Sequence, residues 1–500
     1  MNALLALLPI IIVLILMLVF RWSSPLAGLV GWCCGLLVAW LAFGLNWPVF
    51  WVSQAKGLML TFNVILVLWP AIFLYNIVDQ IGGVTAIALA LQGMVHDKGW
   101  LLVLQAWMLS AIIECLTGFG LPIAMVAPLL IALGVSPVLA VSAVAIGHPW
   151  ASSTGGMALA LRLLAEITHY TPEALFPASA LLLGLSILLT GLAVAFLLGQ
   201  KQQWWRVLIT SCVVAAAHYL LGVSGMLSLA ALISAVIGFT VGAWLSRKPR
   251  EASRTKAPLN PALVAGLIAY GILVVIMLVV SVFPPLNRVL SPIVWTLQFP
   301  SVATANGVVT PAESGYLFHI FTHPGVLILI TIALSLLAFR IYPAIPALDL
   351  KKSLKVTMKS GVPAALGTLF MIGLSTTMEH AGMTQALAKS LSALVGGVYP
   401  LFAPVIGVIG SFATGSNVNS NVLFGALQKE VAILVGASPV VILAAQTTGG
   451  SMGSMIAPAK LAVGTSTSSV KGHEGDVLRI TLPICLAIAM IIGLVTLLIS

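Results

Sequence analysis

The stretch from Phe412 to Leu427 has the sequence FATGSNVNSNVLFGAL. Eight consecutive residues in it, Thr414 to Asn421, are almost all small, glycine or amide-bearing. The chain that surrounds them is 60% hydrophobic and only 7% charged over 500 residues. A run of this kind either forms a turn in water or has a function at membrane depth, and the rest of the sequence decides which.

Long apolar segments dominate the chain, whose mean hydropathy is +1.15. A helix needs about 20 apolar residues to cross about 30 Å of hydrocarbon, so we predict an all-α polytopic membrane protein with about 12 transmembrane helices. The N-terminal segment has no basic n-region and no small-residue cleavage site, which favours a retained first helix over a signal peptide. The predicted spans are Ala3–Phe20, Pro25–Leu45, Gly57–Asn76, Trp100–Leu116, Ala174–Leu198, Trp205–Leu221, Leu227–Leu245, Leu263–Phe283, Gly325–Phe339, Gly361–Thr377, Tyr399–Ala413 and Leu478–Ile499.

The net charge of +10 comes largely from basic clusters where we expect loops, RKPREASRTK (Arg247–Lys256) and KKSLKVTMK (Lys351–Lys359). Basic residues are enriched in cytoplasmic loops, so we expect both clusters in the cytoplasm and expect no nucleic-acid partner. The Pro284–Pro324 segment then lies on the opposite side, partly dipping inward. We expect no metal and no cofactor.

Two pairs of similar segments indicate an internal duplication. GGVTAIALAL (Gly82–Leu91) is similar to AGMTQALAKSL (Ala381–Leu391), and GVSPVLAV (Gly134–Val141) to GASPVVIL (Gly436–Leu443). Interrupted hydrophobic segments at matching places in two repeats are typical of the binding site of a secondary transporter. We predict one integral membrane domain, residues 1–500, with inverted repeats at about 57–200 and 361–500 and connecting helices at about 201–360.

Each repeat contains a TG dipeptide followed by a short apolar arm. The arms, LPIAMVAPLLIAL and VLFGALQKEVAILV, have 13 and 14 residues. At 1.5 Å per residue each reaches about 20 Å, which is too short to cross the membrane. We therefore predict a re-entrant hairpin or broken helix in each half, with Thr414–Asn421 as one tip whose following half-helix presents its N-terminus to a ligand.

The residues of the two tips suit an anion. A helix N-terminus carries unpaired N–H groups and a partial positive charge, and hydroxyl and amide groups add donors for a carboxylate and a neighbouring hydroxyl. The alternative is that these glycine and asparagine residues only form ordinary loops. The predicted substrate-binding residues are Thr117, Gly118 and Gly120 in the first tip, and Ser416, Asn417, Asn419, Ser420 and Asn421 in the second.

A second polar cluster follows in each half, GHPWASSTGG (Gly147–Gly156) and QTTGGSMGSM (Gln446–Met455). Small hydroxyl-bearing residues either complete the walls of the site or form close-packing seams between helices. From these clusters we include Ser153, Thr154, Thr447 and Thr448 among the predicted substrate-binding residues.

Placing an ionisable residue inside an apolar membrane segment costs free energy, so such residues are candidates for a functional role. Glu114 lies about one turn before the first tip, and we predict that it carries the coupling proton; a structural pairing with a lysine or with backbone donors is the alternative. His148 is a second candidate for proton coupling, unless it is a satisfied structural residue. Lys460 is a candidate for attracting an anion.

The chain resembles the L-lactate permease family, the proton-coupled 2-hydroxymonocarboxylate carriers. The resemblance covers most of the chain and is strongest in ECLTGFGLPIA (Glu114–Ala124), ATGSNVNSNVLFGALQ (Ala413–Gln428) and QTTGGSMGSMIAPAKLAVG (Gln446–Gly464). It implies symport of a proton with L-lactate, glycolate or a related 2-hydroxymonocarboxylate. It also implies a fold of the ion transporter superfamily, with inverted repeats, paired hairpins and an elevator-like displacement of a transport domain.

Several positions depart from residues typical of that family. Cys115, Leu116, His148, Trp150 and Lys460 lie near the predicted pocket. They leave another small organic anion, acetate-like or a sulfonate, as an alternative substrate.

Other functional classes lack their motifs. No GxxxxGK[ST] or HExxH occurs, and GGSMG (Gly449–Gly453) has no preceding strand, so we expect no enzyme. A secondary carrier and an anion channel remain. We expect a multi-pass protein in the plasma (inner) membrane of a prokaryote, with the lipid bilayer and a small organic anion as partners; the oligomeric state is left open.

Overall fold

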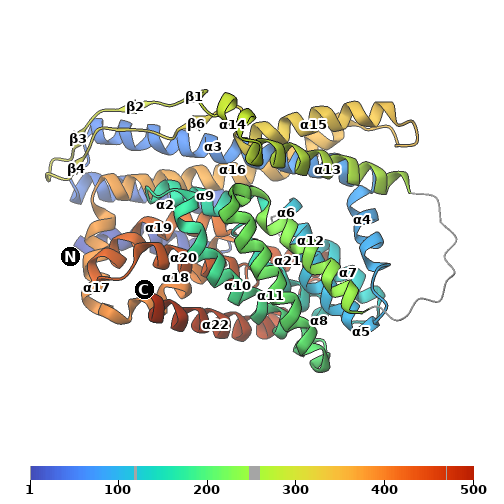
Figure 1. Ribbon diagram of the computed structural model, residues 1–500. Coiled ribbons are helices and arrows are strands. Elements are labelled where there is room, and N and C mark those ends of the chain that lie inside the picture. The colour runs from blue at the N-terminus through green and yellow to red at the C-terminus, as the bar shows by residue number, and fades with distance from the viewer. Residues whose placement is uncertain (1, 118–120, 247–259, 469) are drawn as a thin grey trace.

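The computed structural model describes residues 2–117, 121–246, 260–468 and 470–500 (Figure 1). Helices make up almost all of its regular structure, so the predicted all-α polytopic fold is confirmed. Eleven helical stretches in these residues are long and apolar enough to cross a membrane, against about twelve predicted. The basic segment Arg247–Lys256 and two predicted site residues, Gly118 and Gly120, lie outside the described residues.

The first half of the chain contains both long membrane-length helices and short helical pieces. α5, the π-turn η1 and α6 follow one another without a gap, and α11 meets α12 at Gly225, whose φ is +85°. The elements are α1 (Asn2–Leu18), α2 (Ser24–Ala42), α3 (Trp47–Gln80), α4 (Gly83–Gln92), α5 (Lys98–Leu104), η1 (Gln105–Leu109), α6 (Ser110–Thr117), α7 (Leu121–Ala132), α8 (Pro137–Gly147), η2 (Pro149–Ala151), η3 (Gly156–Ala158), α9 (Leu159–Ile167), α10 (Pro172–Leu197), η4 (Lys201–Gln203), α11 (Trp204–Leu221), η5 (Gly222–Met226) and α12 (Leu227–Leu245).

The second half begins with a helix and a β-ribbon and then returns to helices. Its elements are α13 (Pro261–Val282), α14 (Pro284–Leu290), β1 (Val294–Trp295), β2 (Gln298–Phe299), β3 (Val302–Ala303), β4 (Val309–Thr310), β5 (Glu313–Ser314), β6 (Phe318–His319), α15 (Pro324–Ile341), α16 (Leu350–His380), α17 (Met383–Val395), η6 (Gly396–Val398), α18 (Tyr399–Thr414), α19 (Asn417–Val435), α20 (Pro439–Gly453), α21 (Pro458–Thr467) and α22 (Glu474–Ile499).

Two long helices, α3 and α16, form the centre of one layer and run antiparallel. Asn76 donates to Thr357 Oγ1 at 2.8 Å near one end, and Gln54 donates to Thr377 Oγ1 at 3.0 Å near the other. α2 packs on α16, where Gly35 leaves room for a leucine of α16. With α13 and α15 these helices make the layer that we call the wall (Figure 1).

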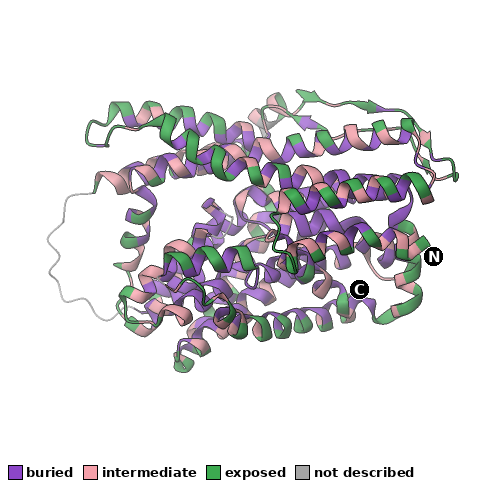
Figure 2. Ribbon diagram, turned by 180° about the vertical axis from the view of Figure 1, so that it is seen from behind, coloured by how far each residue is buried: buried purple, intermediate pink, exposed green. Residues whose placement is uncertain are grey.

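The remaining membrane helices, α6–α12 and α18–α22, form a second layer that we call the bundle. Buried residues gather within the bundle and between the two layers, whereas the outward faces of α13 and α15 are exposed (Figure 2). Glycines allow α18 and α20 to pack backbone against backbone. A Cβ on Gly449 would collide with the carbonyl oxygen of Pro404, and one on Gly407 would collide with that of Gln446.

We expect the substitution Gly449→Val to lower the melting temperature of the purified protein clearly. The new side chain has no space between α18 and α20, and overpacking of this kind costs about 1–3 kcal/mol or more. The matched control is Gly271→Val on α13, where a Cβ meets nothing within 4 Å. Equal melting temperatures for the two variants would show that the α18–α20 contact does not limit stability.

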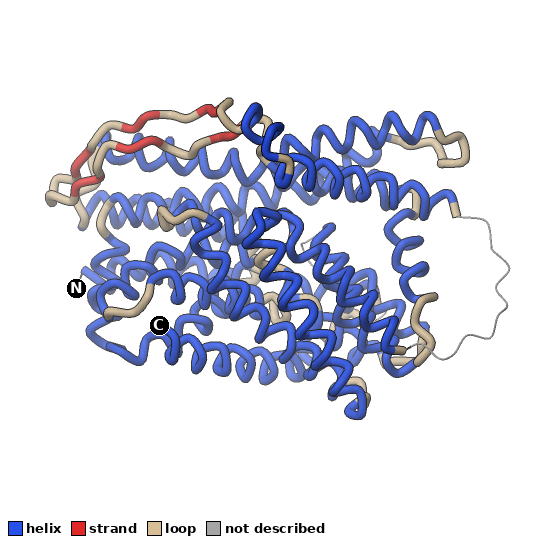
Figure 3. Tube along the Cα trace, viewed as in Figure 1, coloured by secondary structure: helices blue, strands red, loops and turns tan. Residues whose placement is uncertain are grey.

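The segment between α14 and α15 is a two-stranded ribbon on the outer surface of α3. It pairs β1 with β6, β2 with β5 and β3 with β4, all antiparallel, and turns at Gly307, whose φ is +82° (Figure 3). Asn46, which precedes α3, donates to the Ala303 carbonyl, and Lys56 of α3 pairs with Glu313. Part of the Pro284–Pro324 segment therefore forms a ribbon, and its β-branched residues favour paired strands. The inward dip of this segment stays a prediction.

The same order of elements occurs in both halves. A long helix (α3 or α16) ends at a left-handed glycine, Gly82 or Gly382, with φ of +80° or +78°. A short helix, a membrane-length helix, a break, an arm and a Pro-led helix follow in each half. α4 and α17 lie at opposite ends of the molecule in Figure 1, as inverted repeats would require. The inverted relation and its boundaries stay predictions.

Two sequence-based expectations are wrong in detail. The basic cluster Lys351–Lys359 is not a loop but the first turns of α16, where its lysines are exposed. The Pro439–Thr467 stretch was not predicted to span, yet it is long and apolar enough to do so. It is interrupted between α20 and α21, and the polar and glycine residues from Gln446 to Ser454 make it differ from a uniform apolar segment.

Candidate functional site

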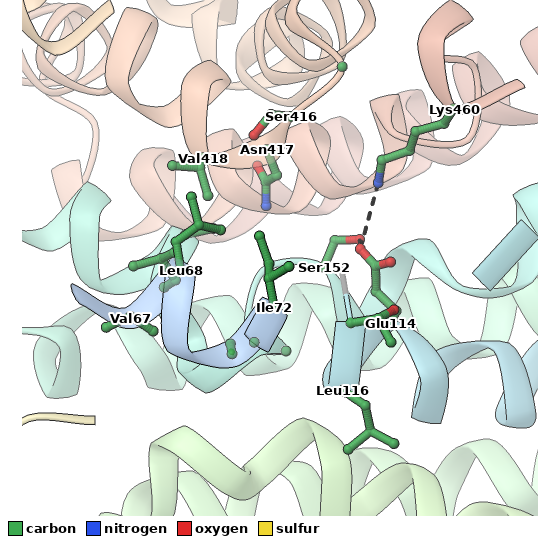
Figure 4. A pocket seen from close by; sticks show the side chains of 17 residues that line it. Val67, Leu68, Ile72, Glu114, Leu116, Ser152, Ser416, Asn417, Val418 and Lys460 are labelled. Atoms are coloured by element: carbon green, nitrogen blue, oxygen red, sulfur yellow. Dashed lines mark hydrogen bonds and ion pairs between the residues drawn. The ribbon is translucent and has the colours of Figure 1, made fainter. Parts of the chain in front are cut away.

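A cavity lies between the wall and the bundle, with about 700 Å³ of space that is partly open to solvent. One side is an apolar face of α3, and polar residues from the bundle lie opposite (Figure 4). The lining residues are Val67, Leu68, Ala71, Ile72, Glu114, Leu116, Thr117, Ser152, Gly155, Gly156, Leu159, Ala160, Gly415, Ser416, Asn417, Val418 and Lys460.

α18 and α19 form a helical hairpin whose tip reaches this cavity. Only two residues interrupt the helices: Gly415, with a φ of +71°, and Ser416, which is extended and caps α19 by accepting from the Asn419 N–H at 3.4 Å. The non-helical tip is therefore shorter than the predicted Thr414–Asn421, because α19 already begins after Ser416. α19 has 19 residues, so the predicted 14-residue arm is also longer than expected.

The first turn of α19 faces the cavity with donor groups. The N–H groups of Asn417 and Val418 have no acceptor within the helix, as at any helix start, and both residues line the cavity. The Asn417 side chain donates to Ser153 Oγ at 2.9 Å and to Ser451 Oγ at 3.3 Å, which fixes its position. This end of α19 therefore provides a partial positive charge where a carboxylate can lie.

The first-half tip contributes Thr117 at the end of α6. Its hydroxyl donates to the Ile113 carbonyl at 2.7 Å, and the residue lines the cavity together with the second tip. α7 begins at Leu121, which is absent from the lining among the described residues. Because residues 118–120 lie outside the described residues, it stays a prediction that the helix after this tip faces the site.

A different helix, α9, brings a second N-terminus to the cavity. Gly156, Met157 and Ala158 all have positive φ, between 53° and 64°. This left-handed turn redirects the chain so that Leu159 and Ala160, the first residues of α9, line the cavity. Sequence reasoning missed α9; the adjacent glycines Gly155 and Gly156 were its only local signal. Two non-glycine residues in this conformation represent strain of the kind that concentrates at functional sites.

An ion pair joins the two halves of the chain across the cavity. Lys460 Nζ from α21 lies 3.6 Å from Glu114 Oε1 from α6, with side chains 7% and 6% exposed. Ser152 donates to the same carboxylate oxygen at 2.8 Å. Glu114 Oε2 is buried and has no hydrogen-bond partner among the described residues. Figure 4 shows the two charged groups pointing toward each other beside Ser152.

Comparisons with known proteins give the family of this chain. The L-lactate permease family matches residues 2–500. The chain belongs to the L-lactate permease family. It is 28% identical to an L-lactate permease of Streptococcus iniae over 88% of this chain and 92% of the relative. It is 25% identical to the glycolate permease GlcA of Escherichia coli K12 and 27% identical to an L-lactate permease of Bacillus subtilis, each over 99% of this chain and 95% of the relative.

Four predicted site residues of this family member lie in the cavity lining: Glu114, Thr117, Ser416 and Asn417. Their placement brings together segments that are distant in the sequence. Whether they bind substrate or carry a proton stays a prediction. The cavity also includes Ser152 and Lys460, of which sequence reasoning selected only Lys460, as a candidate attractor of anions.

Three predicted residues of α19 point elsewhere. Asn419 bonds to side chains of α16 and α2, at 3.2 and 3.4 Å. Ser420 donates to a backbone carbonyl of α18 at 2.8 Å, and Asn421 donates to the backbone of α9 at 3.0 Å. Successive residues of a helix point in different directions, so these three polar residues face different neighbours and connect α19 to them. None of the three is in the lining.

The second polar clusters form a seam in the bundle. Ser153 Oγ bonds to the Thr447 carbonyl and to Ser451 Oγ, each at 2.8 Å. Thr448 donates to its own helix, and Thr154 bonds to a buried histidine of α11, His218, at 2.9 Å. None of Ser153, Thr154, Thr447 and Thr448 lines the cavity. The geometry favours the packing alternative for them, with Ser153 supporting Asn417 from behind.

His148 is buried at the end of α8 and is likewise outside the lining. Its Nδ1 lies 2.8 Å from the Val144 carbonyl oxygen, so that nitrogen is the donor, and Nε2 has no partner within the described residues. Direct contact of His148 with substrate is therefore not supported by its position. Within the described residues no group of three or more His, Cys, Asp or Glu side chains could hold a metal.

Proposed function

We propose that this protein is a secondary carrier that moves a small 2-hydroxymonocarboxylate, such as L-lactate or glycolate, together with a proton across the plasma membrane of a prokaryote. Membership of the L-lactate permease family and the similarity to lactate and glycolate permeases support this substrate class. The single structural observation that carries the proposal is the cavity in which both predicted tips, an ion pair and two helix N-termini meet. We propose the proton as the coupling ion, with no further cofactor and no catalysed chemical change.

The lining suits such a substrate. The carboxylate would accept from the N–H groups at the start of α19, with Ser416 and Asn417 beside it, while the short carbon chain would contact Val67, Leu68 and Ile72 of α3. A buried hydroxyl needs a partner, and the Thr117 and Ser152 side chains are near enough to the cavity to supply one. A substrate without the hydroxyl would leave such a group unpaired and bind less tightly.

The position of the cavity also suits alternating access. It lies where the α3 face of the wall meets the bundle, so displacement of the bundle along the wall would change the side to which the cavity opens. Small bound ligands would move with the bundle residues that hold them, Ser416 and Asn417. This is the elevator-like motion that the family resemblance implies.

We expect preloaded unlabelled L-lactate to accelerate the uptake of labelled L-lactate into proteoliposomes at equal pH on both sides. Counterflow of this kind requires a carrier, because an anion channel dissipates a gradient without exchange. L-lactate and glycolate should also raise the melting temperature of the purified protein, since a ligand that binds the native state stabilises it.

The alternatives are resolved by the same assays. Stabilisation by acetate or a small sulfonate, without any effect of L-lactate or glycolate, would replace the proposed substrate. Uptake that an unlabelled internal pool does not accelerate would favour an anion channel. Liposomes without protein provide the baseline for both measurements.

A further inference from the structure

Lys460 and Glu114 form an ion pair in the cavity, and each residue comes from a different half of the chain. Lys460 is the only basic side chain in the described lining, and Glu114 is the only acidic one. Their separation of 3.6 Å and their low exposure mean that each is the main counter-charge of the other. Removing one member of a buried pair leaves an uncompensated charge, which is strongly unfavourable.

A substrate carboxylate that enters this cavity meets the same lysine. Lys460 lines the cavity together with the α19 tip, so an anion there lies within reach of both. Nevertheless, Glu114 is already paired with Lys460, and two charged carboxylates around one ammonium group would leave a net negative charge beside two side chains that are only 7% and 6% exposed. Only one of the two carboxylates can be charged at low cost.

We propose that Lys460 Nζ binds the substrate carboxylate, and that the Glu114 carboxylate pairs with Lys460 when no substrate is bound. This inference rests on the proposed function. Protonation of Glu114 releases Lys460 Nζ, and the substrate carboxylate becomes its new counter-ion. The protonated Glu114 carboxyl keeps its acceptor contact with Ser152 and gains a hydroxyl that can donate to the substrate.

The charge balance gives this exchange a fixed stoichiometry. The empty cavity holds one ammonium and one carboxylate, and the loaded cavity holds one ammonium, one neutral carboxyl and one substrate carboxylate. Both states are neutral, whereas the substrate alone or the proton alone would leave a charge. One proton, taken from water onto Glu114, therefore accompanies each monocarboxylate.

Few other titratable groups face Glu114 among the described residues. Lys460 approaches it from α21, and His148 lies near the end of α8 with its Nδ1 bonded to a backbone carbonyl. Cys115 is its neighbour on α6 and is buried. A neutral His148 does not alter the balance of one proton per substrate.

The test compares two variants that both lack the ion pair, Glu114→Gln and the double variant Glu114→Gln with Lys460→Gln. L-lactate affinity is measured by calorimetry on the purified, full-length proteins at several pH values. We expect Glu114→Gln to bind L-lactate with an affinity that does not change with pH. The double variant should bind it more weakly by about tenfold or more, since it loses a charge-assisted contact. Neither variant has a pair to break, so a merely structural lysine predicts equal affinities.

Proton uptake gives a second readout. In weakly buffered solution at a pH where the pair is charged, the wild-type protein should take up about one proton per L-lactate bound, as the charge balance requires. Glu114→Gln should take up none, and Lys460→Arg should retain uptake. Lys389→Gln, on the exposed face of α17, is the matched lysine control and should behave as wild type.

The outcomes separate this inference from the proposed function. Equal L-lactate affinities of the single and double variants would overturn the role of Lys460 while leaving the carrier proposal intact. L-lactate binding by the wild type without proton uptake would overturn the exchange with Glu114. A wild-type protein that binds neither L-lactate nor glycolate would overturn the proposed function, and this inference with it.

Discussion

Replacement of Glu114 by glutamine is expected to abolish the accumulation of substrate driven by a pH gradient. Glutamine keeps the shape of the side chain and its acceptor for Ser152, but it cannot exchange a proton. One proton per anion supports about tenfold accumulation for each pH unit, because one unit corresponds to about 1.4 kcal/mol. The variant should reach only the external concentration, whereas exchange of labelled for unlabelled L-lactate should continue. The measurement is uptake into proteoliposomes with and without an imposed pH gradient.

The control for this experiment is Glu173→Gln, the same substitution at an exposed site in the first turn of α10. It should accumulate substrate as the wild type does. If Glu114→Gln responds to the pH gradient as strongly as the wild type, another residue carries the proton. His148 would then be the next candidate, since its Nε2 is buried and has no partner among the described residues.

Replacement of Asn417 by alanine is expected to remove most of the substrate binding while the protein still reaches the membrane. The side chain lines the cavity at the start of α19 and is tied to Ser153 and Ser451. Its loss removes both contacts, so the α19 tip that presents its N–H groups to the cavity is no longer held in place. We expect the L-lactate affinity to fall by about tenfold to a hundredfold, the effect of one or two lost polar contacts at about 1.4 kcal/mol per tenfold.

A matched control lies two residues along the same helix. Asn419→Ala removes the same amide group, but this side chain contacts α16 and α2 rather than the cavity. We expect it to lower the melting temperature with a smaller effect on affinity. Equal losses of affinity in the two variants would mean that the α19 turn, rather than the Asn417 side chain, determines binding. Normal affinity in Asn417→Ala would remove the second tip from the site.

Local composition was sufficient to predict much of the fold. The helical hairpin was expected from the glycine and serine after Thr414, and these two residues do interrupt the helices, Gly415 in the left-handed region and Ser416 as a cap. The two short helices that follow left-handed glycines begin in the similar segments Gly82–Leu91 and Ala381–Leu391. Such features depend on a few adjacent residues, so they can be predicted from one sequence.

The residues that line the cavity were harder to predict. All the polar residues from Ser416 to Asn421 looked alike in composition, yet a helix places Asn417 toward the cavity and Asn419 toward the wall. The sequence did not reveal which helical face would meet which neighbour. The left-handed turn at Met157 and Ala158, two ordinary apolar residues, has no signal in the sequence beyond the preceding Gly155 and Gly156.

The sequence by itself determined that this is an all-α membrane protein with broken helices, since hydropathy and backbone preferences act over short distances along the chain. It also selected Glu114 and the α19 tip as functional suspects, because polar groups within apolar segments are costly. Only the tertiary structure decided that Lys460 pairs with Glu114, that α9 presents its N-terminus to the cavity, and that α3 supplies the apolar side. These choices depend on which helix faces pack together, and that packing is a property of the whole assembled chain.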